Sequence, residues 1–108
     1  MVNWKDLLNR IPHTVHTGYK HRFEIVWVDD FPDGKTAGET RFDPLQIAIK
    51  KGQSDKEAVL TYLHEVLHAV SHTHDIGLTE TQVRKLEKAL TPLLKDDNVF
   101  TKKKRKRK

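Results

Sequence analysis

The segment His64-Glu65-Val66-Leu67-His68 has the residue types and the spacing of a catalytic metal site. Residues four positions apart lie on the same face of a helix, about 5–6 Å from each other, so two imidazoles can share one tetrahedral zinc ion. The carboxylate that follows the first histidine would lie beside the open position of the metal, where it can accept a proton from water and pass it to a leaving amine. We therefore expect His64 and His68 to bind Zn²⁺ and Glu65 to act as general base.

The third metal ligand has several candidates. His74 completes the pattern H-E-x-x-H-x-x-S-x-x-H, but Ser71 occupies the position at which metzincins need a glycine for a sharp turn. Glu80 is the strongest candidate, because it opens the next helix after a turn at Gly77, and an antiparallel helix pair would bring it back to the metal. We expect Glu80 as the third ligand, with His74, Glu87 or a water molecule as alternatives.

The elements that position these side chains are predicted by capping signals and periodicity. Ser54-Asp55-Lys56-Glu57 fits a capping box that starts a long helix, and Thr79-Glu80-Thr81-Gln82 starts a second one. Apolar residues recur in the first helix at 3.6-residue spacing, which predicts one buried side: Val59, Leu63, Val66, Leu67 and Val70. Asn3 can cap a short helix that ends before Pro12.

A small sheet is expected before the long helix. Residues 21–31 alternate in a strand-like pattern, and short segments at 37–43 and 45–50 are separated by Pro44. The polar stretch 13–20 is interpreted as a turn around Gly18. These elements predict an α+β fold: a short N-terminal helix, a mostly antiparallel three-stranded sheet, the H-E-x-x-H helix and a second long helix. The strand at 45–49 is expected to pair with an extended peptide substrate.

The net charge divides the chain into two parts. The formal net charge is +5, but the last seven residues, 102–108, are all basic, so residues 1–101 carry a charge of about −2. Seven clustered cations can bind phosphate backbones without sequence specificity. We expect residues 1–97 to form one metallopeptidase-like domain and residues 98–108 to form a linker and a disordered basic tail that contacts nucleic acid.

Composition excludes several other classes of site. The chain has no cysteine, which excludes disulfides, thiolate metal sites and a cysteine nucleophile. No apolar run reaches the roughly 18 residues of a membrane span, and the first residues lack the apolar stretch of a signal peptide. We expect a soluble cytoplasmic protein of a bacterium or a phage-infected cell, with no membrane partner.

The residues around the motif also resemble a known family. The run Tyr62–Ser71, followed by Gly77–Val83, resembles small phage and bacterial metallopeptidase-like proteins that are grouped with the ImmA/IrrE-type zinc endopeptidases, a minimal gluzincin-like fold. The likeness extends to Thr40-Arg41-Phe42-Asp43 and covers roughly residues 36–95. It implies that His64, His68 and Glu80 are zinc ligands and that Glu65 is the general base. Longer members carry the acidic ligand in an E-x-x-A-N-x-F-A-like stretch, whereas residues 80–86 here read E-T-Q-V-R-K-L.

These patterns predict a zinc-dependent metallopeptidase that hydrolyses peptide bonds in a protein substrate, with a DNA-associated protein as one option. The alternative is a non-catalytic, zinc-containing module that associates with nucleic acid. A metal shell closed by four protein ligands would favour the alternative, because catalytic zinc sites keep one position open.

Overall fold

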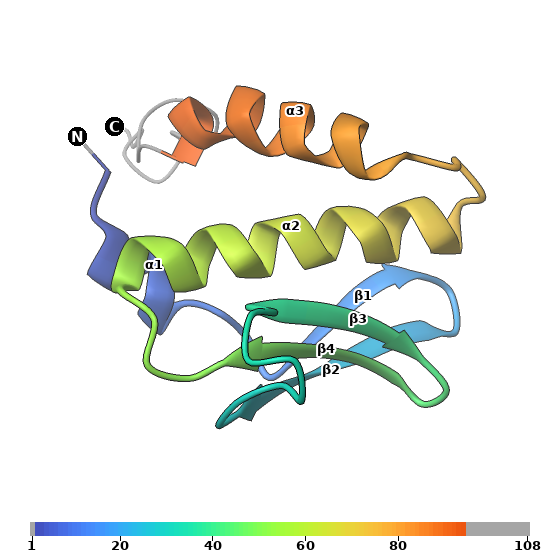
Figure 1. The fold of residues 1–108 in the computed structure, drawn as a ribbon. Coiled ribbons are helices and arrows are strands. Elements are labelled where there is room, and N and C mark those ends of the chain that lie inside the picture. The colour runs from blue at the N-terminus through green and yellow to red at the C-terminus, as the bar shows by residue number, and fades with distance from the viewer. Residues whose placement is uncertain (1, 95–108) are drawn as a thin grey trace, which may run out of the picture.

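The long helix α2, Asp55–Thr73, is the middle layer of the fold in a computed structural model, which describes residues 2–94 (Figure 1). A β-sheet lies on one side of α2, and the helix α3, Glu80–Leu90, lies on the other. A short helix α1, Trp4–Asn9, packs near the start of α2, and a 3₁₀ turn at Thr91–Leu94 continues α3. The predicted α+β class is confirmed.

The helices begin where the capping signals predict. The backbone N–H of Glu57 donates to Ser54 Oγ at 3.2 Å, and the Ser54 N–H donates to Glu57 Oε1 at 3.4 Å. Thr79 and Gln82 make the same reciprocal pair at the start of α3, at 3.1 and 2.8 Å. Each pair satisfies backbone N–H groups that have no partner inside the helix. Asn3 caps α1 through a bond from the Asp6 N–H at 3.0 Å.

Within residues 2–94 the sheet has four strands rather than the predicted three. Their order is β1-β2-β4-β3. The central pair, β2 and β4, is parallel, whereas β1 pairs with β2 and β3 pairs with β4 in antiparallel fashion. The prediction of a mostly antiparallel, three-stranded sheet was therefore wrong in strand number and in its central pair. The strand bounds are Thr14–Gly18 (β1), His21–Val28 (β2), Gly38–Phe42 (β3) and Leu45–Lys50 (β4).

The unpredicted strand, β1, carries little of the alternation that identifies a strand in a sequence. Val15 is its one aliphatic side chain, and it packs against the core. Gly18 allows β1 to approach the end of α2, because a Cβ at this position would lie 2.9 Å from Thr73 Cγ2. The hydroxyls of Thr17 and Thr73 also lie 2.6 Å apart. Contacts with a distant helix, which the local sequence does not show, thus stabilise this strand.

The strand β4 is not an edge strand, so the prediction that it pairs with a peptide substrate was wrong. It lies between β2 and β3, and both of its backbone edges are used within the sheet. The free edge on this side belongs to β3. The Ala37 carbonyl accepts from the Lys50 N–H at 2.8 Å, and bonded pairs alternate along an antiparallel ladder. The backbone groups of Gly38, Thr40 and Phe42 therefore face the free edge.

The hydrophobic core lies between the sheet and α2. It consists of side chains from the two central strands and one from the helix: Phe23, Ile25, Ile47, Ile49 and Ala69. Burial of apolar surface contributes about 25 cal/mol per Å², so this layer anchors α2 on the sheet. On the opposite side of α2, α3 buries Val83 completely.

Two sequence predictions fall wholly or partly outside the structural description. The predicted linker and basic tail, residues 98–108, lie outside the described residues, as does the end of the predicted domain 1–97. In the part of the chain that is described, no helix combines the length and the apolar character that crossing a membrane requires.

Candidate metal centre

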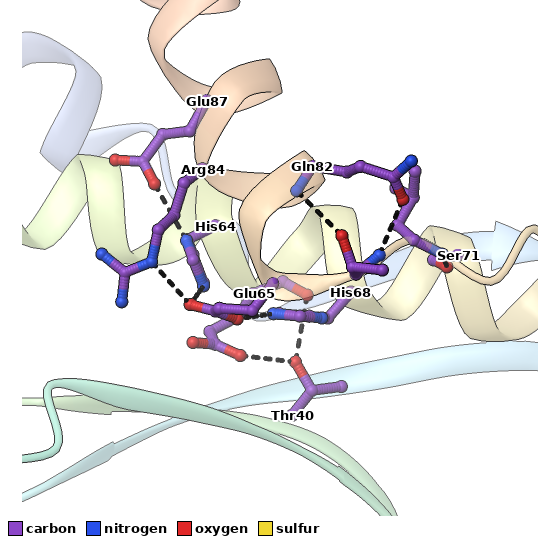
Figure 2. A network of polar contacts seen from close by, with 11 residues as sticks. Thr40, His64, Glu65, His68, Ser71, Gln82, Arg84 and Glu87 are labelled. Atoms are coloured by element: carbon purple, nitrogen blue, oxygen red, sulfur yellow. Dashed lines mark hydrogen bonds and ion pairs between the residues drawn. The ribbon is translucent and has the colours of Figure 1, made fainter.

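Two histidines of α2, His64 and His68 (Figure 2), lie close to the carboxyl group of Glu80 at the start of α3. The rings of His64 and His68 lie one helical turn apart, with centroids separated by 5.0 Å. The Nε2 atom of His64 lies 3.1 Å from Glu80 Oε2, and Nε2 of His68 lies 3.0 Å from Glu80 Oε1. The structure thus brings together the three residues that the sequence analysis predicted as metal ligands.

The geometry of these three side chains fits a metal ion. One ligand atom from each side chain can be chosen so that all three lie within 4.8 Å of one another. A tetrahedral zinc ion with bonds of about 2.0–2.2 Å keeps its ligand atoms about 3.4 Å apart. Small side-chain movements would therefore place His64, His68 and Glu80 on one ion. Two imidazoles and a carboxylate are a donor set of catalytic zinc sites, and also of non-haem Fe(II) sites.

The turn between α2 and α3 brings Glu80 back to the histidines. Asp75 and Gly77 adopt positive φ angles of 54° and 78°, which reverse the direction of the chain. The hydroxyl of Ser71, buried within α2, accepts a hydrogen bond from the Leu78 N–H at 2.9 Å. This bond fixes the returning segment against the helix just before α3 begins.

His74, the alternative ligand of the metzincin-like pattern, lies outside the cluster. The helix α2 continues through Ser71 to Thr73, so the sharp turn of that pattern does not occur. His74 caps the helix, and its Nε2 donates to the carbonyl oxygen of Thr17 at 2.6 Å. Its role in this structure is to attach the end of α2 to strand β1.

The carboxyl group of Glu65 lies on the side of α2 that faces β3. The residue is only 7% exposed, and Thr40 Oγ1 lies 2.8 Å from its Oε1 and 3.0 Å from its backbone carbonyl oxygen. The single hydroxyl proton of Thr40 is shared between these acceptors, and Figure 2 shows this side chain reaching Glu65 from the strand. Burial raises the pKa of the Glu65 carboxyl, against the opposing effects of the Thr40 hydrogen bond and the two nearby imidazoles.

The carboxyl group of Glu80 has the opposite electrostatic balance. Desolvation raises its pKa, but the hydrogen bond with His68 and the charges of His64, His68 and Arg84 outweigh this effect. The net result is a pKa below the usual value, so this carboxyl is held as an anion. An anionic carboxylate is the form that binds a metal.

Two further α3 side chains contact the cluster from the side opposite β3 (Figure 2). Glu87 Oε1 lies 2.9 Å from Nδ1 of His64, where a carboxylate can accept a hydrogen bond from an Nδ1 proton. A neutral ring with its proton on Nδ1 would have the Nε2 lone pair available for a metal. Arg84 donates from Nε to Glu80 Oε2 at 3.1 Å. Glu87, predicted as an alternative ligand, contacts His64 and does not belong to the group of three side chains described above.

The sequence patterns gave no role to Thr40 or Arg84, because each acts through a partner. Thr40 lies 25 residues from Glu65, and no local signal connects them. Arg84 stands four residues after Glu80 on the same helix, a spacing that does predict a side-chain pair. That spacing could have drawn attention to Arg84 once Glu80 was considered as a ligand.

The cluster lies in a cleft of about 1100 Å³ that runs between β3, α2 and α3. Residues of all three elements line it, including Gly38, Thr40, Phe42, Glu65, His72 and Arg84. A volume of this order can hold a peptide segment. The free edge of β3 therefore borders a cleft that contains the candidate metal ligands.

Comparison with known proteins yielded no relative: no protein-family model, curated protein or solved structure matches the chain.

Gly38 allows β3 to pack closely on α2 beside Glu65. A Cβ at this position would lie 2.5 Å from Thr61 Cγ2 and 3.3 Å from Glu65 Cγ. We expect Gly38→Ala to destabilise the fold by about 1–3 kcal/mol through overpacking, as measured by urea unfolding. The double variant with Thr61→Ser should recover part of the loss, because it removes Cγ2 and keeps the hydroxyl that donates to Gln53 at 3.0 Å, whereas the contact of the new Cβ with the Ala48 carbonyl oxygen at 3.2 Å remains. Equal stability of Gly38→Ala and the wild type would contradict this close packing.

Proposed function

We propose that the chain is a zinc-dependent metallopeptidase that hydrolyses peptide bonds in a protein substrate. The observation that carries the proposal is the convergence of His64, His68 and Glu80 beside the buried carboxyl of Glu65 in an open cleft. Catalytic zinc sites have three protein ligands and one open position, and the cluster supplies three such ligands from the described residues.

The chemistry would be divided between the metal and the chain. Zinc held by the three side chains would polarise the scissile carbonyl and lower the pKa of a bound water to about 7. Glu65 would accept the proton of the attacking water. The same carboxyl would then deliver the proton to the leaving amine. Thr40 would fix the carboxyl by holding Oε1.

A peptide substrate would be bound along the free edge of β3. The backbone groups of Gly38, Thr40 and Phe42 face this edge and can form ladder hydrogen bonds with an extended segment. Because Thr40 contacts Glu65, a peptide paired at this position would have its backbone close to the general base.

The experiment that tests the proposal combines metal analysis with digestion of a peptide pool. The purified protein should contain about one zinc per chain. New peptide termini should appear in the pool, and they should not form when a chelator is present from the start. Iron in place of zinc would show that the protein binds a different metal from the one proposed. Zinc retained without cleavage of any peptide would favour the non-catalytic alternative.

Glu87 is expected to raise the affinity of the site through His64. We expect Glu87→Ala to weaken zinc binding by about 10- to 100-fold, because the ring of His64 loses the acceptor that fixes its tautomer and orientation. A competition titration with a chromophoric chelator measures the affinity. Lys88→Ala, an exposed neighbour on α3, is the matched control and should bind zinc like the wild type. Equal zinc affinity of Glu87→Ala and the control would exclude this role.

We also propose that the basic tail, residues 102–108, binds nucleic acid without sequence specificity. Seven cations can displace about six counterions from duplex DNA, so the full chain should show a steep loss of affinity with salt. A chain that ends at residue 101 should lose most of this affinity and of its salt dependence in a fluorescence anisotropy titration. A variant with glutamines at 102–108 controls for tail length. Unchanged DNA binding by both variants would locate any nucleic-acid contact elsewhere.

A further inference from the structure

Two aromatic rings form an exposed platform at one end of the cleft. Phe42 is the last residue of β3, and its ring stacks on His72 of α2 with centroids 4.1 Å apart and planes tilted by 34°. The same ring packs edge-on against Phe23, which is completely buried in the core, at 6.3 Å. Despite this support, Phe42 remains 45% exposed. Both rings of the platform, Phe42 and His72, line the cleft.

This exposure distinguishes Phe42 from the other apolar side chains on the surface. Among the described residues, six large hydrophobic side chains are exposed: Tyr19, Trp27, Phe42, Ile76, Leu86 and Leu93. Of these six, only Phe42 lines the cleft. The centre of the cleft is polar, with His64, His68 and Glu80. The platform thus adds an aromatic surface beside a polar centre, and ligand pockets usually combine aromatic and apolar walls with a few polar groups.

The position of Phe42 on the free edge determines which part of a peptide would reach it. Phe42 lies two residues after Thr40, about 7 Å further along the strand, and both side chains face α2. Residues paired directly across two strands have Cβ atoms about 4.5–5.5 Å apart on the same face. The peptide residue paired with Phe42 would therefore direct its side chain onto the Phe42–His72 platform while the segment beside Thr40 lies at Glu65.

We propose that Phe42 and His72 form a binding subsite for an aromatic or large aliphatic side chain of the substrate, located a short distance from the scissile bond. This proposal rests on the proposed peptidase function and specifies its substrates. The substrates would be extended peptides with a bulky apolar residue at one fixed position. An aromatic side chain would gain both from apolar burial and from ring–ring contact with Phe42.

The test uses the zinc-loaded protein and a series of peptides based on one that it cleaves. Phe, Leu, Ala and Asp are placed in turn at each of the three positions on either side of the scissile bond, and kcat/KM is measured. At one position we expect Phe or Leu to exceed Ala by at least about tenfold, with Asp the poorest. Phe42→Ala and His72→Ala should bring the Phe/Ala ratio towards one.

Two variants keep this result interpretable. Tyr19→Ala removes an aromatic ring that is 89% exposed and lies away from the cleft, and should leave the ratio unchanged. Phe42→Leu retains apolar packing against the core, and should keep a preference for apolar residues while losing the extra preference for Phe over Leu. Thermal melting shows that each variant is folded. A zinc-loaded wild type that cleaves peptides with no apolar preference at any position would overturn the subsite.

A binding measurement separates failure of the subsite from failure of the peptidase proposal. Fluorescein-labelled peptides with Phe or Ala at each position are titrated with zinc-loaded Glu65→Gln, which should bind without cleaving. Tighter binding of a Phe peptide, lost when Phe42→Ala is added, supports the subsite even if the wild type cleaves none of the peptides. Equal binding of all Phe and Ala peptides contradicts it, whatever the activity of the wild type.

Discussion

Replacement of Glu65 by glutamine should reduce kcat/KM for peptide hydrolysis by about 10²- to 10⁴-fold while the protein keeps its zinc. Glutamine has nearly the same shape and can still accept the hydrogen bond from Thr40 through its amide oxygen. It cannot accept the proton of an attacking water. Because Glu65 is not among the candidate metal ligands, His64, His68 and Glu80, the zinc content should remain at about one per chain.

The Glu65→Gln variant should also be at least as stable as the wild type. The buried carboxyl is costly to ionise, and a neutral amide removes this cost. Glu24→Gln, an exposed position on β2, is the matched control for the chemical change and should keep full activity. Loss of zinc together with activity in Glu65→Gln would mean that Glu65 supports the metal site. Full activity of the variant would exclude its role as general base.

Replacement of His64 by alanine should abolish stoichiometric zinc binding, with a loss of affinity larger than the 10- to 100-fold expected for Glu87→Ala. The change removes one of the three candidate ligands and leaves Glu87 without its imidazole partner. In the wild type, zinc at 100 times its Kd should stabilise the fold by about 2.7 kcal/mol. For a domain of this size, that corresponds to a rise in Tm of about 10 °C or more.

Thermal melting with and without zinc measures this effect directly. His64→Ala should show no zinc-dependent rise in Tm, and a chelator should lower the Tm of the wild type but not that of the variant. His16→Ala, at an exposed position on β1, should respond to zinc like the wild type. A full zinc-dependent shift in His64→Ala would place the metal elsewhere in the chain.

The parts of the site that depend on local order were predictable from the sequence. The capping boxes at Ser54 and Thr79 set the starts of α2 and α3, and the spacing of His64 and His68 placed them on one helical face. The position of Glu80 near the two histidines could be predicted because Glu80 starts α3 only a short turn after the end of α2. In each case the determining contacts lie within a few residues along the chain.

The parts that depend on distant contacts could not be predicted. Thr40 contacts Glu65 across 25 residues, and the parallel pairing of β2 with β4 is what makes β3 the free edge. Glu87 illustrates the same limit. It stands seven residues after Glu80 and therefore lies on the same helical face. The sequence alone thus left Glu87 as an alternative metal ligand. Only the packing of α3 on α2 determines that it reaches the Nδ1 side of His64.

The most direct test of the central claim is a crystal structure of the zinc-loaded protein. It should show one zinc ion bound by Nε2 of His64, Nε2 of His68 and the carboxylate of Glu80 at about 2.0–2.2 Å. One coordination position should have no protein ligand and should face the carboxyl of Glu65. A zinc ion enclosed by four protein ligands, or one bound away from these three residues, would contradict the claim that this cleft is a peptidase active site.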